Sequence, residues 1–545
     1  MESYDVCIVG SGPAGGTIAN ELAGSGLKVC VLESGGRKTT EFGDSLREVE
    51  SHGIVVKPHS RERIFGGTST TWAGLSGLLD EIDFMEREWV KYSGWPIERD
   101  ELMPYYIQAA DRFRFPKKEM FEPKHWSKVK SEGSFEVVWK TLEQKVFLAA
   151  AEPQNYSTEF TSVYQRDDTN LILDASVISI EGDATSGRAT FVKVARSDKT
   201  IFRLKARCFI LAANGIENTR LLLSSRFSCE QGLGNEEDQV GRYFMNHIKG
   251  YHGVIKVKRP IKELPAYFGF LSNGFAGYIG HRINEKTQRD KKLLNSYIRF
   301  EPIFGWSDNR GVESAIFFIK RLSFVMKSFR RLHGRKTIML RDYAETGDDS
   351  ELQNERKNVL QYMGMVGAII INFFSVLKYA YFRAFNKSSP KIHAIRIRNF
   401  MEMEPVPENR ILLGEEKDVL GNRLPVVKHR ATALDQRTMV ALHEYLSDEI
   451  SREGWGELIS DIQERGKHWP INGDASHHMG STRMGTNPKH SVLDRNCRVH
   501  SCPNVYIAGA STFPTGGNVN PTFTVVALSI RLADYLKKSL KKDEK

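Results

Sequence analysis

The pattern of apolar positions predicts buried strands at the start of the chain. Residues 4–33 read as an apolar run, a glycine-rich turn, a helical segment and a second apolar run that ends at Glu33. Short apolar runs rich in β-branched residues are typical of parallel strands covered on both faces. Two later runs, around 207–215 and 504–509, also end in small residues, and a helical pattern comes after each one. The pattern predicts a parallel α/β sheet with ligand-binding loops at the carboxyl ends of its strands.

In the middle of the chain the apolar residues recur at a different spacing. Apolar and polar residues alternate at 251–258, 395–404 and 409–413, which predicts antiparallel strands with one exposed face. Residues 414–425 read as a charged turn between two such strands, and residues 434–454 fit an amphipathic helix. A second, α+β unit is therefore expected beside the α/β unit.

The glycine-rich turn at the start of the chain predicts dinucleotide binding. Gly10, Gly12 and Gly15 form G-x-G-x-x-G, with Pro13 and Ala14 between them where a helix begins. The first glycine permits the tight turn, the second lets a pyrophosphate approach, and the third lets helix and strand pack closely. Glu33 ends the second strand and is placed to accept hydrogen bonds from a ribose.

Composition adds only weak constraints. The net charge of +10 in 545 residues is compatible with an anionic partner, but no nucleic-acid motif and no zinc-ligand spacing is visible, so we predict neither nucleic-acid binding nor a metal site. The chain has six cysteines and no C-x-x-C. A reducing compartment and, with the first strand starting close to Met1, a cytoplasmic protein are expected.

Six motifs, in this order along the chain, resemble the glucose-methanol-choline (GMC) oxidoreductases, which are FAD-dependent. They are the glycine turn, FGGTSTTWAG (65–74), LAANGIENTRLLL (211–223), VGRYFMNH (240–247), HHMGSTRMG (477–485) and NVYIAGASTFPTGGNVNPT (504–522). The resemblance implies a Rossmann-like FAD-binding domain with an interleaved α+β substrate domain built on an antiparallel sheet. We place the FAD-binding domain at 1–80, 165–250 and 470–545. The substrate domain takes 81–164 and 251–469, with a helical insertion at about 314–390.

The resemblance also assigns residues to the cofactor. The expected FAD-binding positions are Gly10, Gly12, Pro13, Ala14, Gly15, Glu33, Gly66, Gly67, Thr68, Ser69, Trp72, Ala73, Gly74, Ala213, Gly509, Ala510, Asn520, Pro521 and Thr522. Some related pyranose oxidases attach FAD through a histidine where this chain has Thr71. Because a hydroxyl cannot form that bond, we predict that FAD is bound non-covalently.

The resemblance implies two catalytic residues. The family's base is the histidine three positions before a glycine, which makes it His477 rather than His478, and its partner is Asn520. A base near neutral pKa must take the hydroxyl proton, and an amide can orient the alcohol. A His–Asn pair favours a sugar, glycoside or other alcohol as donor, with oxygen or a quinone as electron acceptor. Two alternatives are an NAD(P)-dependent dehydrogenase and a non-catalytic, membrane-associated flavoprotein.

Two segments outside these motifs suggest contact with a membrane. Residues 358–377 contain no charged side chain over a length that could cross a bilayer, but both ends of the chain must join one sheet, so a single crossing is not expected. Residues 314–336 combine an apolar stripe (Phe318, Leu322, Val325, Phe329, Leu332) with seven cations (Lys320, Arg321, Lys327, Arg330, Arg331, Arg335, Lys336). Lys378, Arg383 and Lys387 follow the apolar segment. We expect a peripheral surface lying in anionic headgroups, with an amphiphilic or lipid-linked substrate. Buried helices or a self-association surface are the alternatives.

Overall fold

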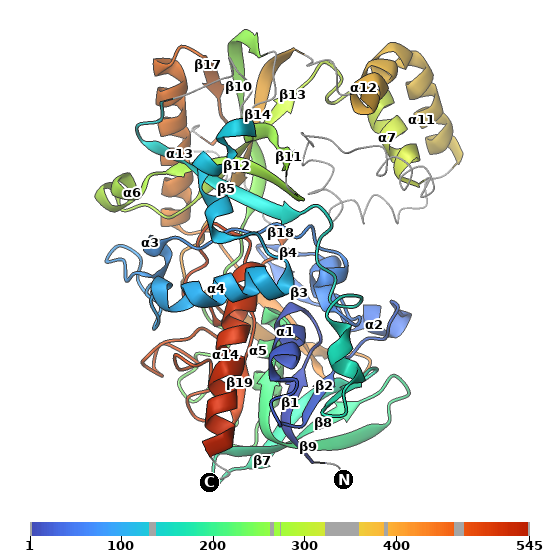
Figure 1. Cartoon of the computed structure of the whole chain (residues 1–545), viewed down its shortest axis with the longest axis vertical. Coiled ribbons are helices and arrows are strands. Elements are labelled where there is room, and N and C mark those ends of the chain that lie inside the picture. The colour runs from blue at the N-terminus through green and yellow to red at the C-terminus, as the bar shows by residue number, and fades with distance from the viewer. Residues whose placement is uncertain are drawn as a thin grey trace.

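Two seven-stranded sheets organise the molecule (Figure 1). The computed structural model describes residues 3–129, 138–261, 266–272, 274–321, 359–385, 391–462 and 474–542. In Figure 1 the first sheet lies near the two termini, and the second lies at the opposite end of the molecule.

The first sheet contains the parallel strands predicted from the apolar runs. Its order is β6-β2-β1-β9-β8-β7, with β19 paired to β9. The parallel members are β1 (Ser3–Val9), β2 (Val29–Leu32), β6 (Thr169–Ile172), β9 (Ile201–Leu211) and β19 (Val505–Ile507). Val6 lies opposite Val29 on one side and Cys208 on the other, and all three are buried. Burial on both faces explains the continuous apolar runs.

Strand β9 has different neighbours along its length. Its first half pairs antiparallel with β8 (Arg188–Ala195), which in turn pairs with β7 (Ser176–Asp183). Its second half pairs in parallel with β19, with Val505 opposite Phe209. The parallel part of the sheet is therefore completed by a strand from near the end of the chain.

Helices pack on this sheet where the sequence predicts them. They are α1 (Pro13–Leu22), α5 (Gly215–Ser224) and α14 (Thr522–Lys542), and a further helix, α4 (Arg99–Phe113), packs on α14. Helix α14 packs against both α1 and α4, and Figure 1 shows it running along the sheet. Tyr106 of α4 joins Thr524 of α14 by a 2.6 Å hydrogen bond between their hydroxyls.

The second sheet is antiparallel and has the order β11-β12-β13-β14-β10-β17, with β5 paired to β12. Its strands are β5 (Leu142–Ala150), β10 (Lys249–Ile261), β11 (Phe270–Ser272), β12 (Phe275–Ile283), β13 (Tyr297–Ile303), β14 (Ile392–Phe400) and β17 (Gly456–Ile459). Helix α13 (Ala433–Arg452) covers one face, where Asn399 and His443 are joined by a 2.6 Å hydrogen bond. The predicted fold class, a Rossmann-like α/β unit with an interleaved α+β unit on an antiparallel sheet, is confirmed.

One strand pair differs from the expectation. β15 (Arg410–Lys417) and β16 (Arg423–Lys428) do not join the second sheet; β16 pairs with β3 (Glu50–His52) instead. Ile411 and Val427 pack with Ile54 and Ile216, which draws the pair towards α5. Strand β15 also extends through Lys417, so the turn is shorter than the predicted 414–425. The smaller elements are α2 (Glu41–Ser45), β4 (Val55–Val56), α3 (Glu81–Phe84), α6 (Glu285–Lys291) and β18 (Asp474–Ala475). The domain boundaries stay a prediction.

Three helices form a separate lobe beside the second sheet: α7 (Arg310–Arg321), α11 (Val359–Ile371) and α12 (Phe373–Phe385) (Figure 1). Among the described helices, none has the length and apolar character to cross a bilayer alone. Among the described helices, α11 and Phe373–Tyr381 are long and apolar enough only when they are taken together, and their axes meet at a bend of 77°. Most of the predicted stripe, with Leu322, Val325, Phe329 and Leu332 and the cations Lys327, Arg330, Arg331, Arg335, Lys336 and Lys387, lies outside the described residues.

Candidate active site

The glycine turn leaves space only for backbone. Gly10 has a φ of +105°, and a Cβ there would come 2.7 Å from the carbonyl oxygen of Ala212. A Cβ on Gly15 would overlap the carbonyl oxygen of Gly10, so this residue lets α1 pack on the turn. Gly12 is the N-cap of α1 and has no side-chain cap, and a Cβ placed on it would come 3.8 Å from the Gly67 Cα atom. The uncapped N–H groups of α1 therefore open into a cradle that fits a pyrophosphate.

Glu33 is more engaged with the protein than expected. Its carboxylate accepts hydrogen bonds from the Ser11 hydroxyl (2.7 Å) and the Gly35 N–H (2.8 Å). Burial raises the pKa of this carboxyl, although these hydrogen bonds oppose the shift. The Ser11 hydroxyl oxygen in turn accepts from the Gly66 N–H at 3.0 Å. Glu33 thus holds the glycine turn to the next motif, and its contact with a ribose stays a prediction.

The 65–74 segment lies directly beside the glycine turn. Gly66 and Gly67 have φ of +90° and +54°, and Gly67–Thr70 form one turn of 3-10 helix. Side chains fix this turn to the segment near residue 155: the Ser69 hydroxyl accepts from the Tyr156 N–H, and Trp72 donates to the Gln154 carbonyl at 2.7 Å. The rest of the predicted segment, Thr68, Ala73 and Gly74, lies on the same loop, and Thr71 is exposed.

Asn218 joins the ends of β9 and β19, a role that the sequence did not reveal. Its Oδ1 accepts from the Ala213 N–H at 3.0 Å, and its Nδ2 donates to the Ala508 carbonyl at 3.2 Å. Asn214 caps α5 by accepting from the N–H groups of Ile216 and Glu217. Asn218 thereby links Ala213 to Ala508, the residue just before Gly509 and Ala510, and the contact of these residues with FAD stays a prediction.

His477 and Asn520 are brought together, with the Asn520 Nδ2 atom 3.3 Å from His477 Nε2. A third residue completes the group. His247 places its Nδ1 atom 2.9 Å from His477 Nδ1, and its Nε2 atom 2.9 Å from the Gly517 carbonyl oxygen. His247 lies in the 240–247 motif, but no feature of that motif indicated a role for its histidine.

The hydrogen-bond partners assign the proton positions in this group. A carbonyl oxygen can only accept, so His247 Nε2 carries the proton, and burial lowers the pKa of His247 to about 4 and keeps the ring neutral. His247 Nδ1 must then accept from His477 Nδ1. The lone pair of His477 therefore lies on Nε2, facing Asn520. Burial, with smaller contributions from His247 and Lys249, also lowers the pKa of His477 well below its usual value.

Backbone pairing places His477, and not His478, beside His247. Met245 and Met479 exchange two 3.0 Å backbone hydrogen bonds, which sets His247 beside His477. The Asn246 Oδ1 atom accepts from the His477 N–H at 2.9 Å. His478 instead has its Nε2 atom 3.4 Å from the Ser60 hydroxyl and is stacked near Phe244.

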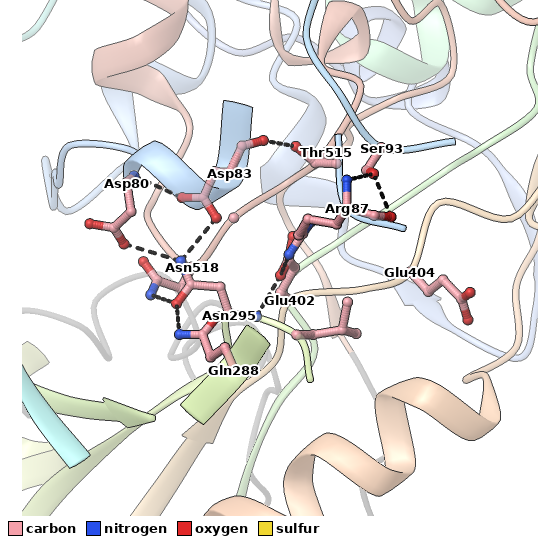
Figure 2. A network of polar contacts seen from close by, with 12 residues as sticks. Asp80, Asp83, Arg87, Ser93, Gln288, Asn295, Glu402, Glu404, Thr515 and Asn518 are labelled. Carbon is pink, nitrogen blue, oxygen red and sulfur yellow. Dashed lines mark hydrogen bonds and ion pairs between the residues drawn. The ribbon is translucent and has the colours of Figure 1, made fainter. Parts of the chain in front are cut away.

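A buried polar network supports the loop that carries Gly517 (Figure 2). Asn295 donates to Asp83 (2.9 Å) and accepts from Asn518 (2.9 Å). Arg87 forms two hydrogen bonds with Glu402, and both side chains are fully buried. Burial, together with Asp80 and Glu402, raises the pKa of Asp83 to about 7. Its side chain lies where a Cβ on Gly517 would clash. The network therefore fixes the carbonyl that orients His247.

Comparisons with known proteins agree with this geometry. A family model described as GMC oxidoreductase matches residues 405–529, and one described as FAD binding domain matches residues 3–46. The chain belongs to the GMC oxidoreductase family. Its curated relatives include the fructose dehydrogenase large subunit of Gluconobacter japonicus, 24% identical over 99% of this chain and 98% of that protein. Paromamine 6'-oxidase of Streptomyces fradiae is 22% identical over 97% and 90%, respectively.

Solved structures support the fold. Pyridoxine 4-oxidase from Mesorbium loti matches with a TM-score of 0.54 at 13% identity, over 98% of this chain and 99% of that one. A formate oxidase from Aspergillus oryzae RIB40 matches with a TM-score of 0.56 at 15% identity, over 100% of this chain and 99% of that one. This GMC oxidoreductase is thus an FAD-dependent enzyme of CH–OH donors, and both alternatives from the sequence, NAD(P) dependence and a non-catalytic flavoprotein, are wrong.

Proposed function

We propose that this GMC oxidoreductase oxidises a CH–OH group of a sugar or glycoside, with His477 as the base. The observation that carries the proposal is the lone pair on His477 Nε2, turned towards the Asn520 amide by the hydrogen bond from His477 Nδ1 to His247. A substrate hydroxyl within hydrogen-bond reach of both Nε2 and the amide would give its proton to His477 while Asn520 holds its oxygen. The flavin, when bound, supplies the acceptor for the hydride.

Burial supports the role of His477 as a base. A base must be unprotonated before it reacts, and the lowered pKa keeps His477 neutral at physiological pH. The uncharged hydrogen-bond chain from Gly517 through His247 also prevents the ring from turning its other nitrogen to the substrate. The proton therefore has one acceptor atom in the site.

The wall next to His477 suits a polyhydroxy substrate. Lys249, Tyr251, Arg299, Glu301 and Arg398 share the face of the second sheet that α13 leaves uncovered, because they alternate with Asn399 on paired strands. Lys249 is close enough to lower the pKa of His477. The hydroxyl groups of a carbohydrate can form hydrogen bonds with such donors and acceptors, whereas the hydrocarbon rings of a sterol cannot. The names of the relatives above, a fructose dehydrogenase and a paromamine oxidase, favour the same class.

The test is anaerobic reduction of the bound flavin. Purified holoenzyme is mixed with sugars, glycosides, lipid-linked sugars, polyols, sterols and aliphatic alcohols, and flavin bleaching is followed. We expect carbohydrates to bleach the flavin and His477→Ala to slow this step by about two orders of magnitude or more with FAD retained. Reoxidation by oxygen or a quinone then identifies the electron acceptor.

Two results would contradict the proposal. Bleaching by sterols or long-chain alcohols but by no carbohydrate would refute the substrate class. Near-normal reduction in His477→Ala, with His478→Ala slow instead, would refute the base.

A further inference from the structure

Helices α11 and α12, here called the apolar hairpin, present an unusual surface. Of the seventeen large apolar side chains exposed in the described part of the chain, ten belong to the hairpin. The most exposed are Ile371 (84%), Phe374 (78%) and Leu360 (77%). No residue of α11 is buried. The buried-helix alternative considered from the sequence is therefore wrong for α11, whereas most of the 314–336 segment lies outside the described residues. An apolar patch of this kind marks an interaction site.

The hairpin is held outward by specific contacts. Asn309, just before α7, donates to Asn372 at the bend (3.0 Å), and Asn372 also donates to the Ala368 carbonyl (2.9 Å). A Cβ on Gly311 would come 2.5 Å from the Asn372 side chain, so a glycine permits this close approach. Tyr362 packs on Phe317 of α7. One side of the hairpin is thus packed on α7 (Figure 1), and its exposed apolar side chains belong to the surface that α7 leaves uncovered.

Charge around the hairpin points to an anionic partner. The sequence contains no Asp or Glu between Glu355 and Glu402 but has eight Lys or Arg residues there. One of them, Lys378, is exposed on α12 directly after the apolar residues. An apolar hairpin that carries Lys378 and no acidic residue of its own matches the interface of a bilayer, where acyl chains lie beneath anionic headgroups. A protein groove would not require the exclusion of acidic residues over this length.

We propose that the apolar hairpin docks the enzyme in the headgroup region of an anionic bilayer without crossing it. Each helix of 13 residues is about 20 Å long, shorter than the hydrocarbon core of about 30 Å. The 77° bend, fixed by Asn309, prevents the two from forming one straight span. Both helices lie along the interface, and the uncharged residues enter it from one side.

Flotation of full-length holoenzyme tests this inference. The probes are vesicles of phosphatidylcholine alone and vesicles that also contain phosphatidylglycerol. We expect flotation with the phosphatidylglycerol vesicles at low salt and a loss of binding as salt screens the cations. In the variant Ile371→Ser/Phe374→Ser, the fraction of protein that floats with the vesicles should fall about tenfold or more, because two highly exposed apolar side chains no longer enter the interface.

The matched control is Ile201→Ser/Ile459→Ser, which changes two apolar side chains exposed elsewhere, on β9 and β17. It should float as the natural chain does, and both variants should retain FAD and full flavin reduction with a soluble substrate. Three results would overturn the proposal: no flotation of the natural chain, equal flotation on neutral vesicles, or equal loss in the control. A dimer that Ile371→Ser/Phe374→Ser converts to a monomer, without flotation, would assign the hairpin to a second copy of the chain.

Discussion

At the scale of single residues, the base depends on a neighbour that touches no substrate in the proposed chemistry. His247 accepts from His477 Nδ1 and donates to the Gly517 carbonyl, so it decides which nitrogen of His477 holds the lone pair. A neutral histidine can exist with the proton on either nitrogen. Without an acceptor at Nδ1, part of the population would present an N–H to the substrate hydroxyl and could not act as the base.

His247 is therefore a positioning residue, and its replacement should slow the chemical step. In His247→Phe we expect flavin reduction to fall by roughly tenfold to a hundredfold, with FAD retained and KM little changed, since lost orientation is less costly than a lost base. His247→Asn should recover part of the rate, because an amide can both accept from His477 Nδ1 and donate to Gly517. Stopped-flow reduction across pH measures both variants.

The pH profile separates positioning from mere support of the fold. Because His477 is neutral until its lowered pKa is reached, the acid limb of the natural enzyme should lie below about 6.5, the ordinary value for histidine. Removal of the His247 ring should move that limb upward, since His247 contributes to the lowered pKa. If His247→Phe reduced its flavin at the rate of the natural enzyme and had the same acid limb in its pH profile, His247 would not be a positioning residue.

Sequence alone could pair His477 with Asn520 through their separation of 43 residues and the motifs around them. It could not find His247, which lies 230 residues before His477 and reaches it only through the Met245–Met479 backbone pairing. The role of Asn218 could not be predicted for the same reason. Its partners follow the ends of two strands that are distant in sequence. Contacts that depend on register between remote segments carry no local signal.

At the scale of elements, the 65–74 loop is a backbone surface whose side chains turn towards protein partners. Ser69 and Trp72 bind the segment near residue 155, and Thr71 is exposed. No side chain there can bond covalently to a flavin as a histidine does. FAD that lies against this loop is therefore expected to be bound non-covalently.

Acid precipitation should release free FAD into the supernatant. The physical reason is that unfolding removes the cradle at Gly12 and Gly67, and no covalent bond then retains the cofactor. Absorbance of supernatant and pellet measures the partition, with Thr71→His as the matched variant that offers a ring nitrogen at this position. Yellow colour that stays in the pellet of the natural chain would disprove non-covalent binding.

Local sequence predicted most elements, and the failures share a cause. The uncharged run at 358–377 was not expected to cross a bilayer once, but its sequence did not reveal the bend at Asn372, which is held by Asn309, 63 residues earlier. Residues 409–413 have the alternation of a strand, yet alternation does not say which sheet the strand joins. Ile411 is placed by its packing with Ile54 and Ile216.

At the scale of the whole molecule, burial of ionisable groups sets how stability depends on pH. Burial lowers the pKa of His281 to about 3 and that of three others, His247, His429 and His443, to about 4. Below pH 6.5 the unfolded chain binds protons that the folded chain does not, so each histidine destabilises the fold as pH falls. Asp83 and Asp435, with pKa raised to about 7 by burial, act in the opposite direction.

A substitution at His281 isolates the contribution of one buried histidine to the pH dependence of stability. The His281 ring is stacked on Phe300, and neither ring nitrogen has a hydrogen-bond partner among the described residues. The free energy of unfolding of His281→Phe should therefore rise, relative to that of the natural enzyme, by about 1.4 kcal/mol for each pH unit below about 6.5. Thermal midpoints of the two holoenzymes, compared at neutral and mildly acidic pH, measure the gap. A gap that stays constant with pH would show that His281 does not remain neutral in the fold.

The exchange of neighbours along β9 has a consequence for how the protein is made. Val505–Ile507 complete the parallel sheet, and Asn520 is reached still later in synthesis. A ribosome that has released the first five hundred residues has produced every strand of the sheet except this one. The parallel sheet and the His477–Asn520 pair are therefore completed only after residue 520 has been synthesised. We expect a chain that stops before Val505 to lack both the last parallel strand and the amide partner of His477.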